Sequence, residues 1–362
     1  MAASLRSRAD PPDLVWVGGH RGLEGRIVRE AGIPLRRLLL RSLRSVERDL
    51  HLLLDPVRLG LSIPQAVALL VRERPAAIFA TGGYLAIPVL AAARILGVPT
   101  LLWEGNVVPG RSVRASAPLA TALAASFPAT CAALAARVCF VTGTPIRDVR
   151  AMDRAAARVR LGIAADERVV LVFGGSQAVR RFNAAVADAV GSAVERATVI
   201  HVTGDEGYAP ALAARERLPE ALRGRYRPAP FLRDEMLPTL VAADLVVGRA
   251  GSSTLAEVAA LGLPMIVVPY PHASGHQRAN ALALVEAGAA RFVEDEAFDG
   301  DAMRAAVALL DDGRALAAMA AGARALGRPG AADATADLLL ALARRRPLPS
   351  ADEIDARSRG TA

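Results

Sequence analysis

The residues best suited to hold a ligand lie between positions 243 and 280. A short apolar run at 245–247 is followed by the small-residue turn GRAGSS at 248–253, an alanine- and leucine-rich segment, and a second apolar run at 265–268. This order predicts a strand, a turn, a helix and another strand. The free N–H groups in the first turn of such a helix face the carboxyl edge of a parallel sheet, where phosphate groups and sugar hydroxyls are held. We interpret this stretch as half of a nucleotide-sugar site.

A second turn of the same kind follows the apolar run at 168–173. It reads Gly174-Gly175-Ser176-Gln177 and precedes a helical segment. Glycines let the backbone approach a phosphate closely, the Ser176 hydroxyl can donate a hydrogen bond, and the helix dipole adds roughly half a positive charge. A tight turn capped by Ser176 explains the same residues without a ligand. The motif alone does not separate the two interpretations.

Glu257 also has two interpretations. With Thr254 it fits a capping box, in which the glutamate folds back onto the first N–H groups of the helix. One turn into a helix at a ligand site, the same carboxylate can accept hydrogen bonds from two ribose hydroxyls. The spacing is compatible with both roles.

The histidines at 272 and 276 are four residues apart, as zinc ligands on a helix would be. Pro269, Pro271 and Gly275 make this segment a loop, and no carboxylate stands in the usual position, so we predict no metal. His276 and Gln277, followed by Asn280, are better interpreted as a polar loop that opens a helix and reaches a diphosphate or a sugar.

Two further turns follow apolar runs in the first half of the chain. They are Thr81-Gly82-Gly83-Tyr84 and Glu104-Gly105-Asn106. Each could be only a turn. Because both lie at carboxyl ends of predicted strands, and two similar turns occur in the second half, we expect them to share a cleft.

The elements that must position these turns alternate between strand and helix. Strands are expected at 14–17, 77–80, 100–103, 120–125, 138–141, 168–173, 198–202, 225–229, 245–247 and 265–268, and a last amphipathic helix at 331–344. Alternation implies a parallel sheet covered on both faces. The predicted fold class is α/β, with two doubly wound Rossmann-like domains facing a cleft. We place the first domain at 1–147, the second at 148–345 with its last helix able to cross back, and a flexible tail at 346–362.

The bulk composition narrows the classes of partner and compartment. The 362 residues carry a net charge of +8, and all 44 basic residues are arginine. The absence of lysine suggests that genome composition helped to select arginine, so the net charge says little about binding partners. The sequence contains no nucleic-acid-binding motif. Cys131 and Cys139 suit a reducing cytosol and are expected to be ordinary small core residues. No stretch resembles a membrane span or a signal peptide.

The segment at 33–72 has two interpretations. Leucines alternate there with arginines, and its later half is apolar. It is either a loop and helix packed on the sheet with a solvated arginine face, or a basic and apolar patch that rests on an anionic membrane. Because no membrane span or signal peptide is found, we expect the protein in the cytosol, at most bound to the membrane surface.

Taken together, the motifs resemble the peripheral-membrane N-acetylglucosaminyltransferases of peptidoglycan synthesis, the MurG family. The matching segments occur in family order and are GGYLAIP (82–88), WEGNVVPG (103–110), VTGTPIR (141–147), GGSQAVRRFN (174–183) and RAGSSTLAEVAALGLPMIVVPYPHASGHQRANA (249–281). The resemblance covers about 15–294 and implies the two-domain architecture called GT-B, without a metal or other cofactor.

The resemblance implies a role for each matching residue. UDP-N-acetylglucosamine would be held by Asn106, Arg147, Ser176, Gln177, Leu232, Gly251, Ser252, Ser253, Thr254, Leu255, Glu257 and Gln277. Among them Glu257 would bind the ribose, and the backbone of Leu232 would contact uracil. Gly82, Gly83 and Tyr84 would face the diphosphate of the acceptor, and the 33–72 patch would sit on the cytoplasmic face of the membrane.

The reaction implied is inverting transfer of N-acetylglucosamine to the muramyl 4-hydroxyl of undecaprenyl-diphospho-muramoylpentapeptide. Helix-start amides and Arg147 would stabilise the departing UDP, and a general base would take the hydroxyl proton. The alternative is a non-catalytic UDP-sugar-binding or scaffold protein. A nicotinamide oxidoreductase would need a GxGxxG turn followed by an acid, which is not found.

The departures from the family concentrate at the beginning. Val17-Gly18-Gly19-His20 resembles a family loop, GGTGGH, whose histidine is a candidate base, but GLEGRIVREAGIPL after it resembles the segment following the family's second strand. We therefore expect the first strand, its glycine loop and its helix to be missing, and His20 to be a surface histidine. Smaller departures are Trp103 for histidine, Val113 for asparagine, Thr144 for asparagine and Ala178 for glycine.

Overall fold

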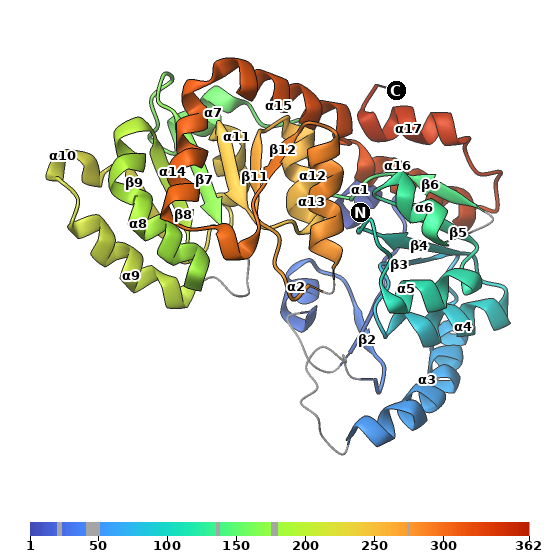
Figure 1. Cartoon of the computed structure of the whole chain (residues 1–362). Coiled ribbons are helices and arrows are strands. Elements are labelled where there is room, and N and C mark those ends of the chain that lie inside the picture. The colour runs from blue at the N-terminus through green and yellow to red at the C-terminus, as the bar shows by residue number, and fades with distance from the viewer. Residues whose placement is uncertain (20–23, 41–50, 135–137, 175–179, 274, 362) are drawn as a thin grey trace. The chain divides into compact units, whose positions relative to one another are not determined.

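The computed structural model describes residues 1–19, 24–40, 51–134, 138–174, 180–273 and 275–361. The chain forms two compact units (Figure 1). The first unit comprises Met1–Pro145 together with Gly330–Ala362, and the second comprises Ile146–Pro329. The change of unit after Pro145 lies close to the predicted boundary at 147, whereas the return at Gly330 precedes the last predicted helix.

The second unit is built on a parallel sheet of six strands in the order β12-β11-β10-β7-β8-β9. The strands are β7 (Val169–Phe173), β8 (Thr198–Val202), β9 (Tyr226–Ala229), β10 (Leu245–Gly248), β11 (Met265–Val267) and β12 (Ala290–Phe292). Sequence analysis placed the first five of these and missed β12. Because the order reverses between β7 and β10, this sheet has the topological switch point of a doubly wound fold.

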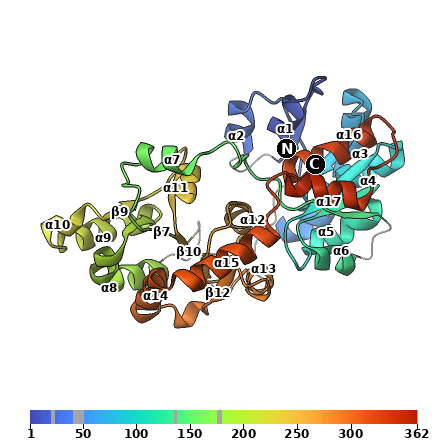
Figure 2. The ribbon, with the colours of Figure 1, turned by 90° about the horizontal axis from the view of Figure 1, so that it is seen from above.

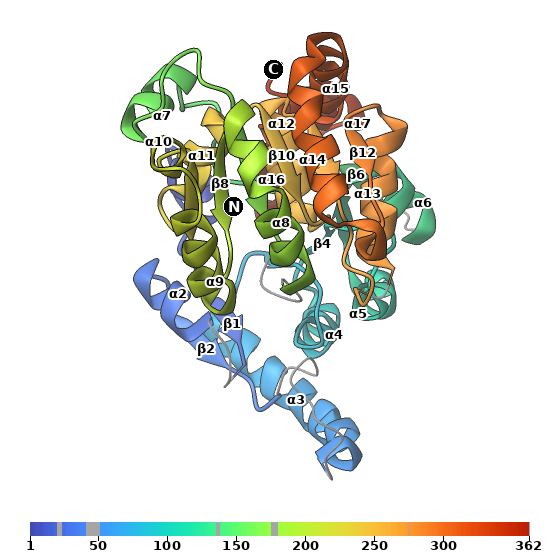
Figure 3. The same cartoon turned by 60° about the vertical axis from the view of Figure 1, so that its left-hand side comes forward.

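Helices cover both faces of this sheet, which is why its strands are apolar on both sides. Val170 and Val172 pack on one face with α8 and α14, and Val169 and Leu171 pack on the other with α11 and α12. Figures 2 and 3 show α8 and α14 side by side. The helices are α7 (Arg154–Arg160), α8 (Arg180–Arg196), α9 (Asp205–Glu216), α10 (Glu220–Arg223), α11 (Met236–Ala242), α12 (Ser252–Leu261), α13 (His276–Glu286), α14 (Gly300–Ala308) and α15 (Gly313–Leu326).

The first unit contains two parallel sheets, not the single sheet predicted. One pairs β1 (Trp16–Gly18) with β2 (Leu35–Arg37), and the other has the order β3 (Ile78–Ala80), β4 (Thr100–Glu104), β5 (Ala122–Ala125), β6 (Cys139–Val141). Among the described residues no strand joins β1 to β3, so the backbone ladder is interrupted between them. Val17 of β1 and Ile78 of β3 nevertheless pack against the same apolar cluster.

The helices of the first unit include some that pack on each face of the four-stranded sheet. They are α1 (Ala2–Arg6), α2 (Glu24–Glu30), α3 (His51–Glu73), α4 (Ala86–Leu96), α5 (Arg111–Ser116), α6 (Pro128–Leu134), α16 (Ala331–Ala343) and α17 (Ala351–Arg359). Leu90 of α4 packs with Leu102 and Leu123, whereas Leu338 of α16 packs with Leu101 and Phe140. No helix of the described residues is long and apolar enough to cross a membrane.

The C-terminal segment differs from the predicted flexible tail. Residues 351–359 form α17, whose start is fixed by a capping box between Ser350 and Glu353. Ile354 is buried against the sheet of the first unit. The proline-rich, charged composition concealed two apolar side chains, Leu348 and Ile354, which pack on the same apolar cluster, and a helix cap. Together these attach the segment to the first unit.

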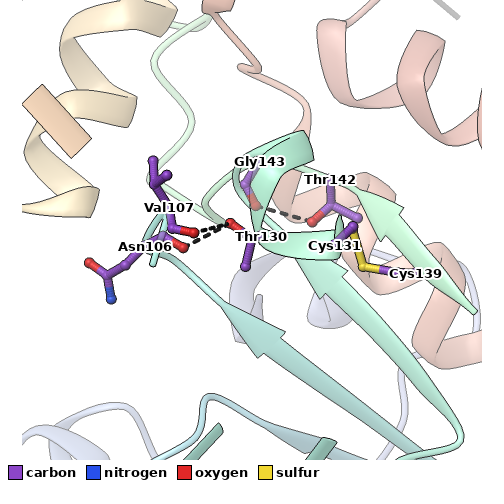
Figure 4. Close-up of a disulfide and its surroundings, with 7 residues drawn as sticks. All are labelled: Asn106, Val107, Thr130, Cys131, Cys139, Thr142 and Gly143. Atoms are coloured by element: carbon purple, nitrogen blue, oxygen red, sulfur yellow. Dashed lines mark hydrogen bonds between the residues drawn. A yellow bond between two sulfur atoms is a disulfide. The ribbon is translucent and has the colours of Figure 1, made fainter. Parts of the chain in front are cut away.

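The two cysteines also differ from prediction, because Cys131 and Cys139 form a disulfide (Figure 4). Their Cα atoms are 5.7 Å apart, a distance that suits such a bond. The expectation of two unlinked core residues rested on the number of cysteines and the expected compartment. Neither indicates that Cys131 in α6 lies close to Cys139 at the start of β6. Both side chains are half-buried.

Candidate functional site

The ends of β7 and β10, which precede the two glycine turns in the sequence, lie side by side at the switch point. Phe173, the last residue of β7, pairs with Gly248, the last residue of β10. A Cβ atom at Gly248 would lie 2.9 Å from the carbonyl oxygen of Phe173, so only glycine lets the two strand ends approach this closely. The carboxyl edge of the sheet at this point is where doubly wound folds bind ligands.

The GRAGSS turn leads directly into α12. The helix begins at Ser252 with Gly251 as its N-cap, and no side chain caps its first turn. Ser252 and Thr254 are half-buried and Ser253 is exposed, while Leu255 is buried in the core. The amides of the first turn and the positive end of the helix dipole are therefore available to an anion.

Two side chains from α13 brace this turn. The Gln277 Oε1 atom accepts hydrogen bonds from the N–H groups of Ala250 at 3.2 Å and Tyr270 at 2.9 Å. The buried Asn280 amide donates to the carbonyl of Ala250 at 3.3 Å. The prediction that His276 opens a helix is confirmed, since α13 begins there. Gln277 thus lies at the turn with which it was grouped.

Glu257 is not a capping-box residue, in contrast to one of its two interpretations. Because α12 starts at Ser252, Glu257 lies in the second turn and cannot reach back to the first N–H groups. Its carboxylate instead accepts from Arg147 Nε at 3.3 Å and Nη2 at 3.1 Å. The glutamate side chain is only 14% exposed and the arginine is 50% exposed. Two residues assigned to one ligand are therefore paired with each other.

Leu232 lies beside a cavity of about 510 Å³ lined by Arg160 and residues 230–235. Its side chain is half-buried against the core, whereas the preceding Phe231 is 55% exposed. An exposed aromatic ring next to an available backbone suits a flat heterocycle. The pattern of the sequence gave no sign of this cavity.

Sequence reasoning assigned no role to Arg249, which anchors the GRAGSS turn from within. It is 4% exposed, forms an ion pair with Asp295 and donates to the carbonyl of Val268 at 3.2 Å. Its guanidinium lies 5.3 Å from the ring centre of Phe182 and 5.6 Å from that of Tyr270. This packing holds the ends of β10 and β11 together. The position of Arg249 inside the GRAGSS motif was the one sequence feature that could have indicated this role.

A buried network behind the other glycine turn was also missed. His201 Nδ1 lies 2.8 Å from the Tyr226 hydroxyl, and its Nε2 lies 3.0 Å from Asn183 Oδ1 in the first turns of α8. Desolvation lowers the pKa of His201 to about 3 and raises the pKa of Tyr226, so both groups are neutral near pH 7. The network fixes the beginning of α8 against β8 and β9.

In the first unit, the predicted residue Asn106 lies in a tightly held turn after β4. The buried Glu104 carboxylate accepts from the Asn106 N–H at 2.9 Å, the Asn106 side-chain amide at 2.8 Å and the Gly110 N–H at 2.9 Å. Trp103, which departs from the family histidine, donates its indole N–H to the carbonyl of Gly143 at 3.0 Å.

Gly82 and Gly83 form the other predicted turn of the first unit. Both have positive φ, at 75° and 83°, so glycine is required. The Gly83 N–H donates to the hydroxyl of Ser112 at 3.2 Å. A Cβ atom at Gly82 would lie 2.5 Å from a methyl group of Val113, the residue that replaces a frequent family asparagine. The turn therefore packs directly against the start of α5, where the departing residue Val113 is buried.

Three predicted site residues, His20, Ser176 and Gln177, lie outside the described residues, as does Ala178. Within the described ranges no group of three histidine, cysteine, aspartate or glutamate side chains is arranged to hold a metal. His272 is exposed, and the ring contact recorded for it is with Tyr270.

Comparison with known proteins defines the class. The model of the glycosyltransferase family 28 N-terminal domain matches residues 3–125, and that of the C-terminal domain matches residues 169–335. The crystal structure of MurG from Acinetobacter baumannii is 27% identical and superposes with a TM-score of 0.72, covering 90% of each chain. The two family models and the shared fold therefore define a family 28 glycosyltransferase, which confirms the predicted GT-B fold class.

Closer relatives specify the family. Proteins from Desulforudis audaxviator and Moorella thermoacetica are 38% and 35% identical, over 95% and 94% of this chain and 94% and 93% of their own lengths. Both are named UDP-N-acetylglucosamine–N-acetylmuramyl-(pentapeptide) pyrophosphoryl-undecaprenol N-acetylglucosamine transferase. The chain belongs to this family, the MurG glycosyltransferases, as the motif resemblance predicted.

Proposed function

We propose that the chain transfers N-acetylglucosamine from UDP-N-acetylglucosamine to the muramyl 4-hydroxyl of undecaprenyl-diphospho-muramoylpentapeptide. The hydroxyl oxygen attacks the anomeric carbon while the bond from that carbon to the UDP oxygen breaks, and the configuration inverts. The observation that carries the proposal is the close pairing of the ends of β7 and β10 at the switch point of the second unit, within a chain of this family.

We assign donor contacts from the geometry of the second unit. The α12 amides at 252–254 and Arg147 would bind the diphosphate, Glu257 would accept from the ribose hydroxyls, and the backbone near Leu232 would receive uracil. Negative charge grows on the diphosphate as it leaves, and fixed amides and a guanidinium stabilise such charge most effectively. Binding requires Arg147 to leave Glu257, so that each partner contacts its own part of the ligand.

We infer that the first unit rests on an anionic membrane surface through the outer faces of α3 and α4. These two helices pack together and expose Leu61 (63%), Val71 (54%) and Ile95 (68%). Arg72 and Arg94 are exposed on the same helices. Apolar side chains would enter the headgroup region, while each arginine near anionic lipid contributes about 1 kcal/mol. The proposed location is the cytoplasmic face of the cell membrane.

The transfer is tested by mixing purified protein with UDP-N-acetylglucosamine and a lipid-linked muramoylpentapeptide acceptor and measuring UDP release. We expect release that depends on the acceptor. Glu257→Gln should raise the KM for the donor roughly 10- to 100-fold, because hydrogen bonds to a charged group contribute about 1.5–3 kcal/mol. Glu216→Gln, which removes the charge from an ion pair with Arg223 that includes no residue of the turns, is the matched control.

The scaffold alternative predicts a different result in the same assay. Binding of UDP-N-acetylglucosamine without acceptor-dependent release of UDP would support a sugar-nucleotide-binding protein and contradict the transferase. Absence of any affinity for UDP would contradict both.

The membrane proposal is tested by co-sedimentation with vesicles. We expect binding to vesicles containing phosphatidylglycerol and little binding to phosphatidylcholine vesicles. The double variant Leu61→Gln and Ile95→Gln should reduce binding severalfold, whereas Val159→Gln, on α7 of the second unit and 80% exposed, should not. Equal binding by both variants would contradict the assignment of this face.

A further inference from the structure

The Asn106 turn is held from a second side by Thr130. The Thr130 hydroxyl donates to the carbonyl of Asn106 at 2.8 Å, with a longer contact of 3.4 Å to the carbonyl of Val107 (Figure 4). Thr130 is fully buried. Glu104 therefore fixes the N–H groups of the turn, and Thr130 fixes its carbonyl groups. Loss of either side chain would remove hydrogen bonds that hold the turn in this conformation.

The disulfide lies next to this contact in the chain. Cys131 follows Thr130 in α6, and Cys139 begins β6 (Figure 4). Helix α6 has seven residues, which is too short to be stable without tertiary contacts. A covalent link eight positions along the chain restricts its movement away from the sheet. The link therefore restrains the helix that carries the Thr130 hydroxyl.

We propose that Thr130 is a positioning residue for Asn106, and that the redox state of the Cys131–Cys139 pair sets how firmly it holds the turn. The inference rests on the proposed function and on the donor-binding role that the family resemblance implies for Asn106. With the disulfide formed, the turn is preorganised and the donor binds without ordering it. With two thiols, α6 moves more freely, the hydroxyl leaves the carbonyls more often, and donor affinity falls.

The redox step balances as a thiol–disulfide exchange with a low-molecular-weight disulfide such as glutathione disulfide. One cysteine thiolate attacks a sulfur of glutathione disulfide and releases one glutathione thiolate. The other cysteine then attacks the mixed disulfide and releases the second. The two protein thiols lose two electrons and two protons in total, and one glutathione disulfide becomes two glutathione molecules. Both cysteine residues are half-buried, so neither is sealed in the core.

The test measures the affinity for UDP-N-acetylglucosamine by calorimetry, using full-length protein treated with glutathione disulfide or with dithiothreitol. Thiol titration should give no free thiols in the first state and two in the second. We expect reduction to weaken binding three- to tenfold. The double variant Cys131→Ser and Cys139→Ser should bind like the reduced protein under both conditions.

Variants at Thr130 separate positioning from folding. Thr130→Val keeps the shape and removes the hydroxyl, so it should weaken donor binding, whereas Thr130→Ser keeps the hydroxyl and should restore it. If wild-type protein binds the donor equally in both redox states and Thr130→Val binds like Thr130→Ser, the inference is wrong while the proposed function stands. If wild-type protein binds no donor in either state, the proposed function fails as well.

Discussion

Arg147 and Glu257 neutralise each other in the structure, and the proposed ligand would separate them. Their ion pair is half-exposed on the arginine side, so it should contribute no more than about 1 kcal/mol to stability. We predict that Arg147→Ala changes the melting temperature of the second unit by only a few degrees. The same change should lower the affinity for UDP roughly tenfold or more, because a cation facing the diphosphate is lost.

Scanning and titration calorimetry on the same samples would check this prediction. A large loss of thermal stability with unchanged UDP affinity would mean that Arg147 supports the fold and does not bind the ligand.

His201 makes the second unit sensitive to acid. Its pKa is about 3 in the folded protein, because burial disfavours the charged ring, and about 6.5 when unfolded. Below pH 6.5 the unfolded chain takes up a proton that the folded chain refuses, so stability falls as the pH decreases. The contribution lost between pH 7 and pH 5 is about 2 kcal/mol.

Chemical denaturation of wild type and His201→Gln at pH 7 and pH 5, followed by circular dichroism, measures this difference. The variant should lose about 2 kcal/mol less than wild type over the interval. Equal losses would show that the ring is accessible to protons in the native state. Both tryptophans, Trp16 and Trp103, belong to the first unit, so their fluorescence distinguishes its unfolding from that of the second.

At the level of single residues, the sequence indicated the turns at strand ends better than the side chains that support them. The GRAGSS turn and Gln277 were grouped in the prediction because small and polar residues at strand ends are typical of turns that hold a ligand. In the structure the Ala250 N–H of this turn donates to Gln277. Arg249, His201 and Thr130 were not predicted, since their roles depend on partners up to 46 positions away. The choice between two roles for Glu257 required knowing where α12 begins.

Among the elements, α15 packs against the end of α13 so closely that one glycine is indispensable. A Cβ atom at Gly322 would lie 2.3 Å from the carbonyl oxygen of Ala287 and 2.8 Å from the carbonyl carbon of Gly288. Because backbone cannot swing aside, Gly322→Ala should destabilise the second unit by about 1–3 kcal/mol. Thermal unfolding in comparison with wild type measures the effect.

Gly191 provides the matched control, since it lies inside α8 with no atom within 4 Å of an added Cβ. Gly191→Ala should stabilise the same unit by about 0.5–1 kcal/mol through helix propensity. Similar destabilisation by both substitutions would contradict the packing argument and point to a general intolerance of alanine.

Helices and strands with a clear local pattern of apolar residues could be predicted from the sequence. Those defined by contacts with distant residues could not. The run at 198–202 gives β8 with the predicted bounds, because its β-branched residues are buried on both faces. β12 has three residues and exposes Arg291, so its pattern is too short to recognise. The division of the first unit into two sheets reflects pairing between strands, which no local pattern specifies.

For the whole molecule, the return of residues 330–362 to the first unit makes that unit dependent on the end of the chain. α16 and α17 cover Leu101, Ala122, Ala124 and Phe140. We predict that truncation after Pro329 exposes this face and abolishes the unfolding transition seen by tryptophan fluorescence. The second unit, complete within Ile146–Pro329, should retain a calorimetric transition.

Ile354→Ala is a milder form of the same experiment. This side chain is 2% exposed, and its truncation should lower the stability of the first unit by about 2–5 kcal/mol while leaving the second unchanged. A loss confined to the second unit, or unfolding of both after truncation at 329, would contradict the division of the chain.

The same return segment has a consequence for synthesis. As the nascent chain leaves the ribosome, residues 1–145 emerge first but lack the two helices that cover one face of their sheet. The second unit is continuous and can close as soon as Pro329 has emerged. The part made first is therefore the part completed last, and its uncovered sheet is what a chaperone would meet during translation.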